Sequence, residues 1–478
     1  MEVSSSKIVS LDESPDEKSY RVPFAALTTL FFMWGFITCM NDILIPYLKE
    51  LYNLSYLRSM LIQFCFFGAY FTGSLIYFLI FRYKPHVINK VGYKKGMLIG
   101  LFVAAAACLL FFPAASYSSF EFFLSALFLL GLGFTLLQIT ANPYVSLMGS
   151  EKGASSRLNL AQAFNSLGTT IAPIIGGFLI FEYFVTEGDI SADSMKKPYL
   201  IFALMFVLLA LFLSRIKFPL VKSDELQTDS LGALKFPQLR LGIFAIFFYV
   251  GAEVAIGSLM INYLQQANIM NFSEGVAKNY LALYWGGAMI GRFLGSISLS
   301  DSISNKMKPV YMLLAALSVV ALIFVIVDVA MASFKYYLLL ILVNFIGFYI
   351  GQAAPAKTLA VFAAINIGLL LLSIFNTGSV SMWTLVGVGL FNSIMWSNIF
   401  TLSIAGLKNY TSQGSSLLVM AILGGAVIPL LQGALADTIG LQLSFFLPVL
   451  CYVYIFIFGL SRWKYAVNKK APRAFTPH

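Results

Sequence analysis

The sequence predicts an all-α membrane protein with many transmembrane helices, and its composition and its long apolar runs are the observations that predict it. Of its 478 residues, 59% are hydrophobic and only 11% are charged, whereas roughly a quarter of the residues in a soluble domain are charged. A soluble protein of this size cannot bury so much apolar surface. The 45 Phe and 24 Tyr exclude a disordered chain, and the presence of only 4 Cys excludes a disulfide scaffold.

The apolar residues form runs of about 17–25 residues, the length at which a helix crosses the hydrocarbon core of a bilayer. These runs are too long and too continuous for the strands of a membrane β-barrel. We therefore expect fourteen transmembrane helices, at 24–47, 57–80, 96–113, 120–147, 158–180, 198–214, 240–263, 279–300, 309–331, 336–353, 357–375, 380–404, 413–435 and 441–461.

The Lys and Arg residues predict the orientation of these helices. With the N-terminus inside, 24 of them fall on inner segments and 6 on outer loops. Positive residues are retained on the cytoplasmic side, so we expect a multi-pass protein of the cytoplasmic (inner) membrane with both termini in the cytoplasm. We assign the net charge of +10 to the membrane surface rather than to nucleic acid.

Parts of the chain repeat at fixed offsets. The matches are Phe31, Phe32 and Gly35 with Phe247, Phe248 and Gly251, 216 residues later, and Gly168, Pro173 and Gly177 with Gly424, Pro429 and Gly433, 256 residues later. The offset grows by 40 residues, about one helical hairpin. We therefore predict six helices followed by six helices with an inserted two-helix hairpin, at 309–353 or at 336–376, and we favour the first. Two six-helix halves are the layout of a major facilitator transporter.

This layout predicts the domain organisation. The expected parts are a cytoplasmic N-terminal tail (1–21), an N-terminal six-helix half (22–214), a cytoplasmic linker (215–239), a C-terminal half with the inserted hairpin (240–462) and a cytoplasmic C-terminal tail (463–478). The chain has only two histidines, His86 and His478, and its cysteines lie in apolar runs. We therefore expect no metal site, no cofactor and no enzymatic activity.

Charged residues inside a membrane are costly, so they are candidates for function. Asp42 lies in the outer half of the first span and shares a helix face with Trp34 and Asn41. A carboxylate removed from water readily binds a proton, and it can equally hold Na⁺ with neighbouring oxygens. We assign cation coupling to Asp42, the alternative being an Asp that merely ends a helix. For Glu253 and Arg292, in the seventh and eighth spans, we favour a structural intramembrane pair.

Amides on neighbouring spans are candidates for ligand binding, since each offers hydrogen-bond donors and acceptors that suit a neutral, hydroxyl-rich ligand. Aromatic rings offer faces for stacking on a sugar ring. The alternative role for each is hydrogen bonding or packing between helices. The candidate substrate-binding residues are Gln138, Asn142, Gln162, Asn165, Asn41, Trp34, Trp285 and, in the second half, Asn392.

Several stretches together resemble the fucose–galactose–glucose:proton symporter family of the major facilitator superfamily, and most closely its bacterial glucose/galactose transporter branch. The similar stretches are 31–35, 41–46, 138–145, 249–253, 284–292, 389–395 and 411–437. The resemblance implies that Asp42 is the proton-linked carboxylate. Fucose members carry a Glu where this sequence has Gln138, which favours glucose or galactose over fucose. Related members couple to Na⁺, so the resemblance leaves the cation open.

These observations predict a symporter that imports a neutral hexose with H⁺ or Na⁺ by alternating access, as a monomer in the lipid bilayer. One alternative is an exporter of amphipathic compounds with the same fold. Another is a sugar receptor that does not transport. A membrane-embedded enzyme would need converging nucleophiles, bases or metal ligands, and the predicted spans contain no histidine and few acids.

Overall fold

The computed structural model describes residues 18–83, 85–148, 154–183, 191–218, 232–298, 303–304, 306–327, 331–351, 354–407 and 410–470. Within these ranges the regular structure is helical and contains no strand, which confirms the all-α prediction. Eleven helical stretches of the described chain are long and apolar enough to cross a membrane. Of the fourteen predicted spans, the other three are also helical, in the more polar α6 and α9 and in α11.

The first half of the chain contains five of the eleven membrane-length apolar stretches, and the more polar α6 is its sixth long helix. Its helices are α1 (Lys18–Leu51), α2 (Tyr56–Ser59), α3 (Leu61–Tyr83), α4 (Pro85–Ser116), α5 (Phe120–Leu147), α6 (Ala154–Phe178) with the π-helical turn η2 (Leu179–Tyr183), the 3-10 turn η3 (Ala192–Met195) and α7 (Lys196–Arg215). In this half α1 packs along α6, and α4 packs against both α5 and α7. A break in α4 falls at Gly92, whose φ of +65° suits glycine.

The second half is longer. It comprises η4 (Gly232–Lys235), α8 (Pro237–Gln265), α9 (Glu274–Ser298), α10 (Lys308–Ile326), α11 (Met331–Gly351), α12 (Pro355–Phe375), α13 (Gly378–Asn392), α14 (Met395–Ile404), α15 (Thr411–Met420), η6 (Ala421–Leu423), α16 (Gly424–Ile439), α17 (Leu441–Ser444) and α18 (Phe446–Lys470). Here α8 packs along α16, and α12 packs against both α13 and α18.

The repeated glycines lie at equivalent helix crossings in the two halves. A Cβ on Gly35 of α1 would lie 2.8 Å from the carbonyl carbon of Asn165 in α6. A Cβ on Gly251 of α8 would lie 3.0 Å from the carbonyl oxygen of Gly424 in α16. Small residues allow such close backbone approach between membrane helices. The sequence repeat is therefore also a repeat in packing.

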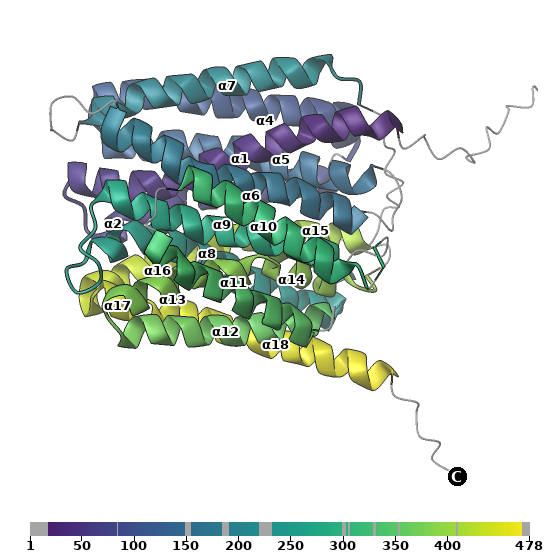
Figure 1. Cartoon of the computed structure of the whole chain (residues 1–478). Coiled ribbons are helices and arrows are strands. Elements are labelled where there is room, and N and C mark those ends of the chain that lie inside the picture. The colour runs from purple at the N-terminus through teal and green to yellow at the C-terminus, as the bar shows by residue number, and fades with distance from the viewer. Residues whose placement is uncertain are drawn as a thin grey trace, which may run out of the picture.

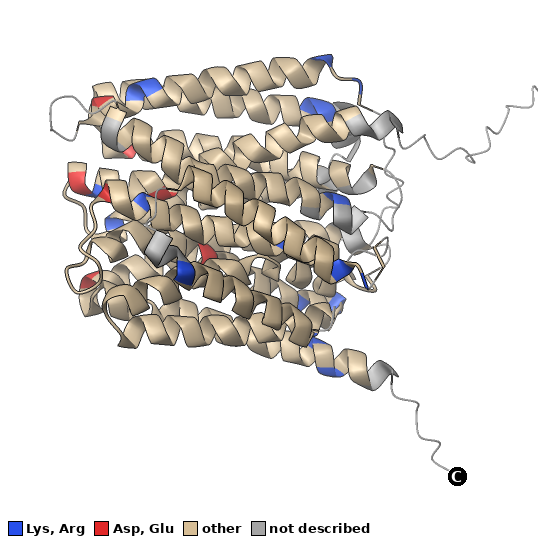
Figure 2. Ribbon diagram, in the orientation of Figure 1, with Lys and Arg blue, Asp and Glu red and all other residues tan. Residues whose placement is uncertain are grey.

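The helices lie side by side with their axes roughly aligned. The first half (purple to blue) lies on one side of the bundle, and the end of the second half (yellow-green) lies on the other (Figure 1). The halves meet where α6 packs against α9 and α3 packs against α16. Described Asp and Glu residues gather toward one end of the bundle, whereas the end at which α18 leaves shows Lys and Arg only (Figure 2). This asymmetry separates the two ends of the bundle by charge.

Candidate functional site

Asp42 lies buried between the two halves, with 3% of its surface exposed. Its Oδ1 accepts hydrogen bonds from Gln63 Nε2 of α3 and from Ser258 Oγ of α8, both at 3.0 Å. Its Oδ2 accepts one from Trp285 Nε1 of α9 at 3.2 Å, and Cys39 Sγ lies 3.7 Å away. Hydrogen bonding to protein donors compensates the burial of the carboxylate. Because α8 and α9 belong to the second half, the carboxylate bridges the halves.

A cavity of about 30 Å³ lies beside this carboxylate. It is lined by Thr38, Cys39, Asp42, Gln63, Phe67, Thr169, Val254 and Trp285. A volume of this size holds a water molecule or a small cation and is far too small for a hexose. Gly257 makes the close approach of α8 feasible, since a Cβ there would lie 3.3 Å from Asp42 Oδ2 and 3.0 Å from the Trp285 ring.

Gln63 and Ser258 are functional candidates that the sequence reasoning did not select. Gln63 Nε2 also donates to Ser258 Oγ at 2.8 Å, and Asn41 Nδ2 approaches Gln63 Oε1 at 3.4 Å. The repeat carried a signal for Ser258, because the offset of 216 places Ser258 at the position equivalent to Asp42. No comparable signal marked Gln63, a lone amide in an apolar run.

Four of the five amide candidates of the first half lie on α5 and α6, which pack against each other, and the fifth, Asn41, lies on α1. Gln162 Nε2 lies 3.5 Å from Asn142 Oδ1, so the structure brings these two together. Gln138 lies one turn before Asn142 on α5 and is buried, with 6% of its surface exposed. Asn165 instead donates to the Phe31 carbonyl of α1 at 3.1 Å. In this conformation Asn165 therefore holds two helices together.

The aromatic and second-half candidates also have protein partners. Trp34 Nε1 donates to the Tyr70 hydroxyl at 3.0 Å, and the ring is buried. Asn392 is fully buried: its Oδ1 accepts from the Tyr452 hydroxyl at 2.6 Å and from Asn366 Nδ2 at 2.9 Å, while its Nδ2 donates to the Tyr284 hydroxyl at 3.0 Å. Three protein partners thus hold the amide of Asn392 in this conformation.

Glu253 and Arg292 do not form the ion pair that the sequence suggested, since no contact between them within 4.0 Å is found in the described chain. Glu253 Oε1 accepts from the Tyr249 hydroxyl at 2.7 Å. Arg292 donates to the Ser393 carbonyl at 3.3 Å and to the Ser166 hydroxyl of α6. The Glu253 carboxylate thus has its hydrogen-bond donor one turn away on its own helix α8, whereas Arg292 donates to other segments and reaches across the seam between the halves.

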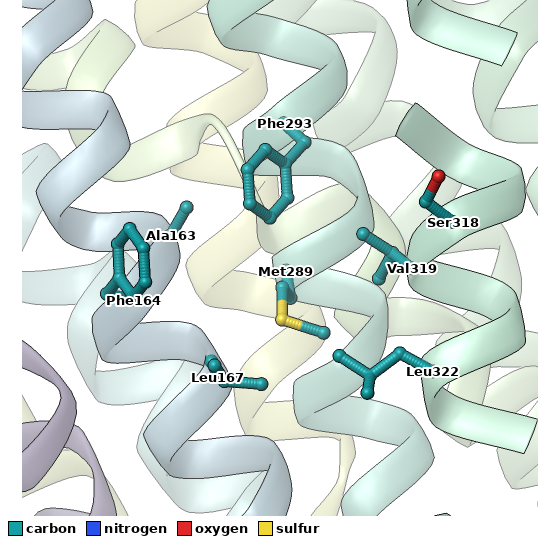
Figure 3. Close-up of a pocket in the computed structure, with 8 residues that line it drawn as sticks. All are labelled: Ala163, Phe164, Leu167, Met289, Phe293, Ser318, Val319 and Leu322. Atoms are coloured by element: carbon teal, nitrogen blue, oxygen red, sulfur yellow. The ribbon is translucent and has the colours of Figure 1, made fainter. Parts of the chain in front are cut away.

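A larger cavity, of about 170 Å³, lies away from Asp42 where α6, α9 and α10 meet. Figure 3 shows its lining residues, Ala163, Phe164, Leu167, Met289, Phe293, Ser318, Val319 and Leu322. Ser318 is the one lining residue with a polar hydroxyl, and it donates to the Leu314 carbonyl of its own helix. A sugar needs many hydrogen-bonding partners, so this apolar crevice does not suit one.

Comparisons with known proteins agree with this architecture. A model of the Major Facilitator Superfamily matches residues 24–360. The "Glucose/galactose transporter" of Brucella abortus is 43% identical over 94% of this chain and 96% of its own length. The "L-fucose-proton symporter" of Escherichia coli is 30% identical over 95% of this chain and 96% of its own. The crystal structure of the E. coli fucose:proton symporter superposes with a TM-score of 0.65, covering 93% of this chain and 99% of that one.

Proposed function

Since this chain belongs to the major facilitator superfamily, we propose that it is a secondary transporter that imports a neutral hexose, glucose or galactose, together with a proton by alternating access. The observation that carries the proposal is the buried Asp42 carboxylate, which receives donors from both halves of the molecule. The "Glucose/galactose transporter" of Brucella abortus and the "L-fucose-proton symporter" of E. coli support the substrate class and the proton. The alternative is coupling to Na⁺ in place of H⁺, and uptake under imposed pH or Na⁺ gradients distinguishes the two.

Asp42 couples the cation to the movement of the halves. When the halves separate on the outer side, Ser258 and Trp285 leave with α8 and α9, and the carboxylate loses two donors and meets water. There it takes up a proton. The neutral acid returns to the closed interior at much lower cost than the charged form, so protonation favours closure and carries the proton inward. A membrane potential adds roughly 2.3 kcal/mol per charge per 100 mV to this step.

The sugar docks on the amides of the first half. Gln138, Asn142 and Gln162 lie on two adjoining helices, and each offers donors and acceptors to hydroxyl groups. Support also comes from Gln138, a neutral residue where the fucose members carry a Glu. In this conformation the outer ends of the halves are in contact near Asp42, so the amides are reached from the opposite side.

Orientation and the inserted hairpin are part of the proposal. We place both termini in the cytoplasm, because the described charged residues at the end of the bundle where α18 leaves are Lys and Arg (Figure 2). We assign the insertion to α10 and α11, since α12 packs against α13 and α18 as α4 packs against α5 and α7. The transporter then acts as a monomer in the cytoplasmic membrane.

The test is uptake of radiolabelled glucose by proteoliposomes under imposed pH or Na⁺ gradients, with galactose and fucose as competitors. We expect accumulation driven by the pH gradient, inhibited by galactose and not by fucose. Accumulation driven only by a Na⁺ gradient would show that the coupling ion is Na⁺ and not H⁺. Binding of sugar without uptake would overturn the proposal of transport altogether. Asp42→Asn should lose accumulation and keep counterflow exchange. The matched control is Asp193→Asn, which removes an exposed carboxylate paired with Lys196 at 2.7 Å, and it should accumulate sugar like the wild type.

A further inference from the structure

A second carboxylate, Asp437 near the end of α16, connects the two halves at the acidic end of the bundle. Its Oδ1 accepts the backbone N–H of Tyr56 and its Oδ2 accepts that of Leu57, both at 2.8 Å. Tyr56 and Leu57 begin α2 in the first half, whereas α16 belongs to the second half. We infer that Asp437 is a latch that holds the outer side of the transporter closed. The inference rests on the proposed alternating-access function and adds a positioning residue to it.

The latch can exist only while the outer ends of the halves touch. Gly433, one turn before Asp437, allows this approach, because a Cβ there would lie 2.8 Å from the Tyr56 carbonyl oxygen and from Met60 Cγ. Helix α16 therefore lies directly against the start of α2. Any outward opening that separates α16 from α2 must break both hydrogen bonds of Asp437.

The chemistry of the contact favours an ionised Asp at this position. Two N–H donors face two carboxylate oxygens, and bonds to an ionised acceptor are roughly twice as strong as neutral ones. An Asn keeps one acceptor oxygen but points an NH₂ group at the second N–H, so it loses one bond and the charge. An Ala leaves both N–H groups without this partner. The expected order of closed-state stability is Asp, then Asn, then Ala.

Cys39 provides a reporter of the closed state. It is 2% exposed and lines the small cavity beside Asp42, so it becomes reachable from outside when the outer side opens. The assay uses a chain in which Cys65, Cys108 and Cys451 are replaced by Ala. Intact cells receive a membrane-impermeant maleimide in the absence of sugar, and the rate at which Cys39 is labelled is measured.

We expect Asp437→Ala to label roughly tenfold faster than the parent, the factor that corresponds to 1.4 kcal/mol, with Asp437→Asn in between. The control is Thr438→Ala, since within the described chain the Thr438 hydroxyl donates to its own helix, to the Ala434 and Leu435 carbonyls, both at 3.1 Å. That variant should label at the parental rate. Transport gives a second readout: Asp437→Ala should lower the external KM for hexose and also lower the maximal rate, because outward-open protein is more abundant and closes less readily.

Equal labelling of the parent and Asp437→Ala, with both at normal surface abundance, would overturn the latch. So would equal acceleration in Thr438→Ala. The labelling assay needs neither sugar nor a proton gradient, so a failure of hexose uptake leaves it valid. Conversely, normal uptake with unchanged labelling refutes the latch alone. Asp437→Asn, nearly identical in shape to the native residue, keeps the test decisive if the Ala variant does not reach the membrane.

Discussion

The crossing of α1 and α6 permits no side chain at Gly168. A Cβ at this position would lie 2.7 Å from the Phe36 backbone nitrogen and closer still to the Phe32 carbonyl oxygen. Both neighbours are backbone atoms of α1. Unlike a side chain, they cannot avoid the new methyl group by adopting another rotamer. The change Gly168→Ala therefore forces the two helices apart. Gly424→Ala should do the same to α8 and α16, because a Cβ there would lie 2.6 Å from the Phe247 carbonyl carbon.

The magnitude follows from two opposing contributions. Overpacking a well-packed interior typically costs about 1–3 kcal/mol, and a clash with backbone belongs at the upper end. Replacing Gly by Ala inside a helix gains about 0.5–1 kcal/mol. We therefore expect each variant to be destabilised by about 2–2.5 kcal/mol, which lowers the melting temperature by several degrees. Transport should slow as well, because α1 carries Asp42.

Thermal unfolding of the purified protein in detergent measures this effect. Gly368→Ala in α12 is the control, since a Cβ there meets nothing within 4 Å. The control should melt at the parental temperature or slightly above it. If Gly168→Ala or Gly424→Ala melted like the control, the close crossing of the repeated glycines would be refuted.

Three further changes test the site and its surroundings. Trp285→Phe keeps an aromatic ring but removes the N–H that donates to Asp42. The maximal uptake rate should therefore fall severalfold with little change in the sugar KM. A change in KM alone would instead assign the ring to stacking on the sugar. Gln63→Leu removes a donor shared by Asp42 and a neighbouring hydroxyl, and it should reduce the ratio of accumulated to external sugar while counterflow continues; unchanged accumulation would exclude Gln63 from coupling. Glu274, before the predicted span 279–300, has its pKa raised to about 7 by burial and by the nearby Glu50 charge. Because this folded-state pKa exceeds the ordinary value of 4.5, its contribution to stability is full below pH 4.5 and is lost as pH rises through about 7. Melting temperatures between roughly pH 5 and pH 8 should therefore fall less in Glu274→Gln than in the parent, and equal slopes would contradict this assignment.

The elements of the fold were predictable because the bilayer fixes the length of an apolar helix and repeated glycines mark helix crossings. The match of Gly35 and Gly251 in sequence became a match in packing. Asp42 was a candidate from the sequence for a similar reason, since a carboxylate inside an apolar run is energetically costly, and its role in coupling stays a prediction.

The partners of Asp42 were harder to predict, because they lie on three other helices and depend on how those helices face one another. The sequence suggests that Trp285 stacks on a sugar, and in this conformation its indole N–H donates a hydrogen bond to the Asp42 carboxylate. Glu253 and Arg292 form no direct ion pair in the described chain: Glu253 accepts from Tyr249 on its own helix, and Arg292 donates to the Ser393 carbonyl. Residue types along one helix do not determine which neighbouring helix satisfies each polar group.

The central claim is that Asp42 binds the proton that moves with the sugar. It is tested most directly by the proton flux that sugar itself drives in proteoliposomes, with no imposed pH gradient. Addition of glucose outside should make the external medium more alkaline with the wild type, and Asp42→Asn should show no such change while it still exchanges labelled glucose. A sugar-driven proton flux of normal size in Asp42→Asn would contradict the account.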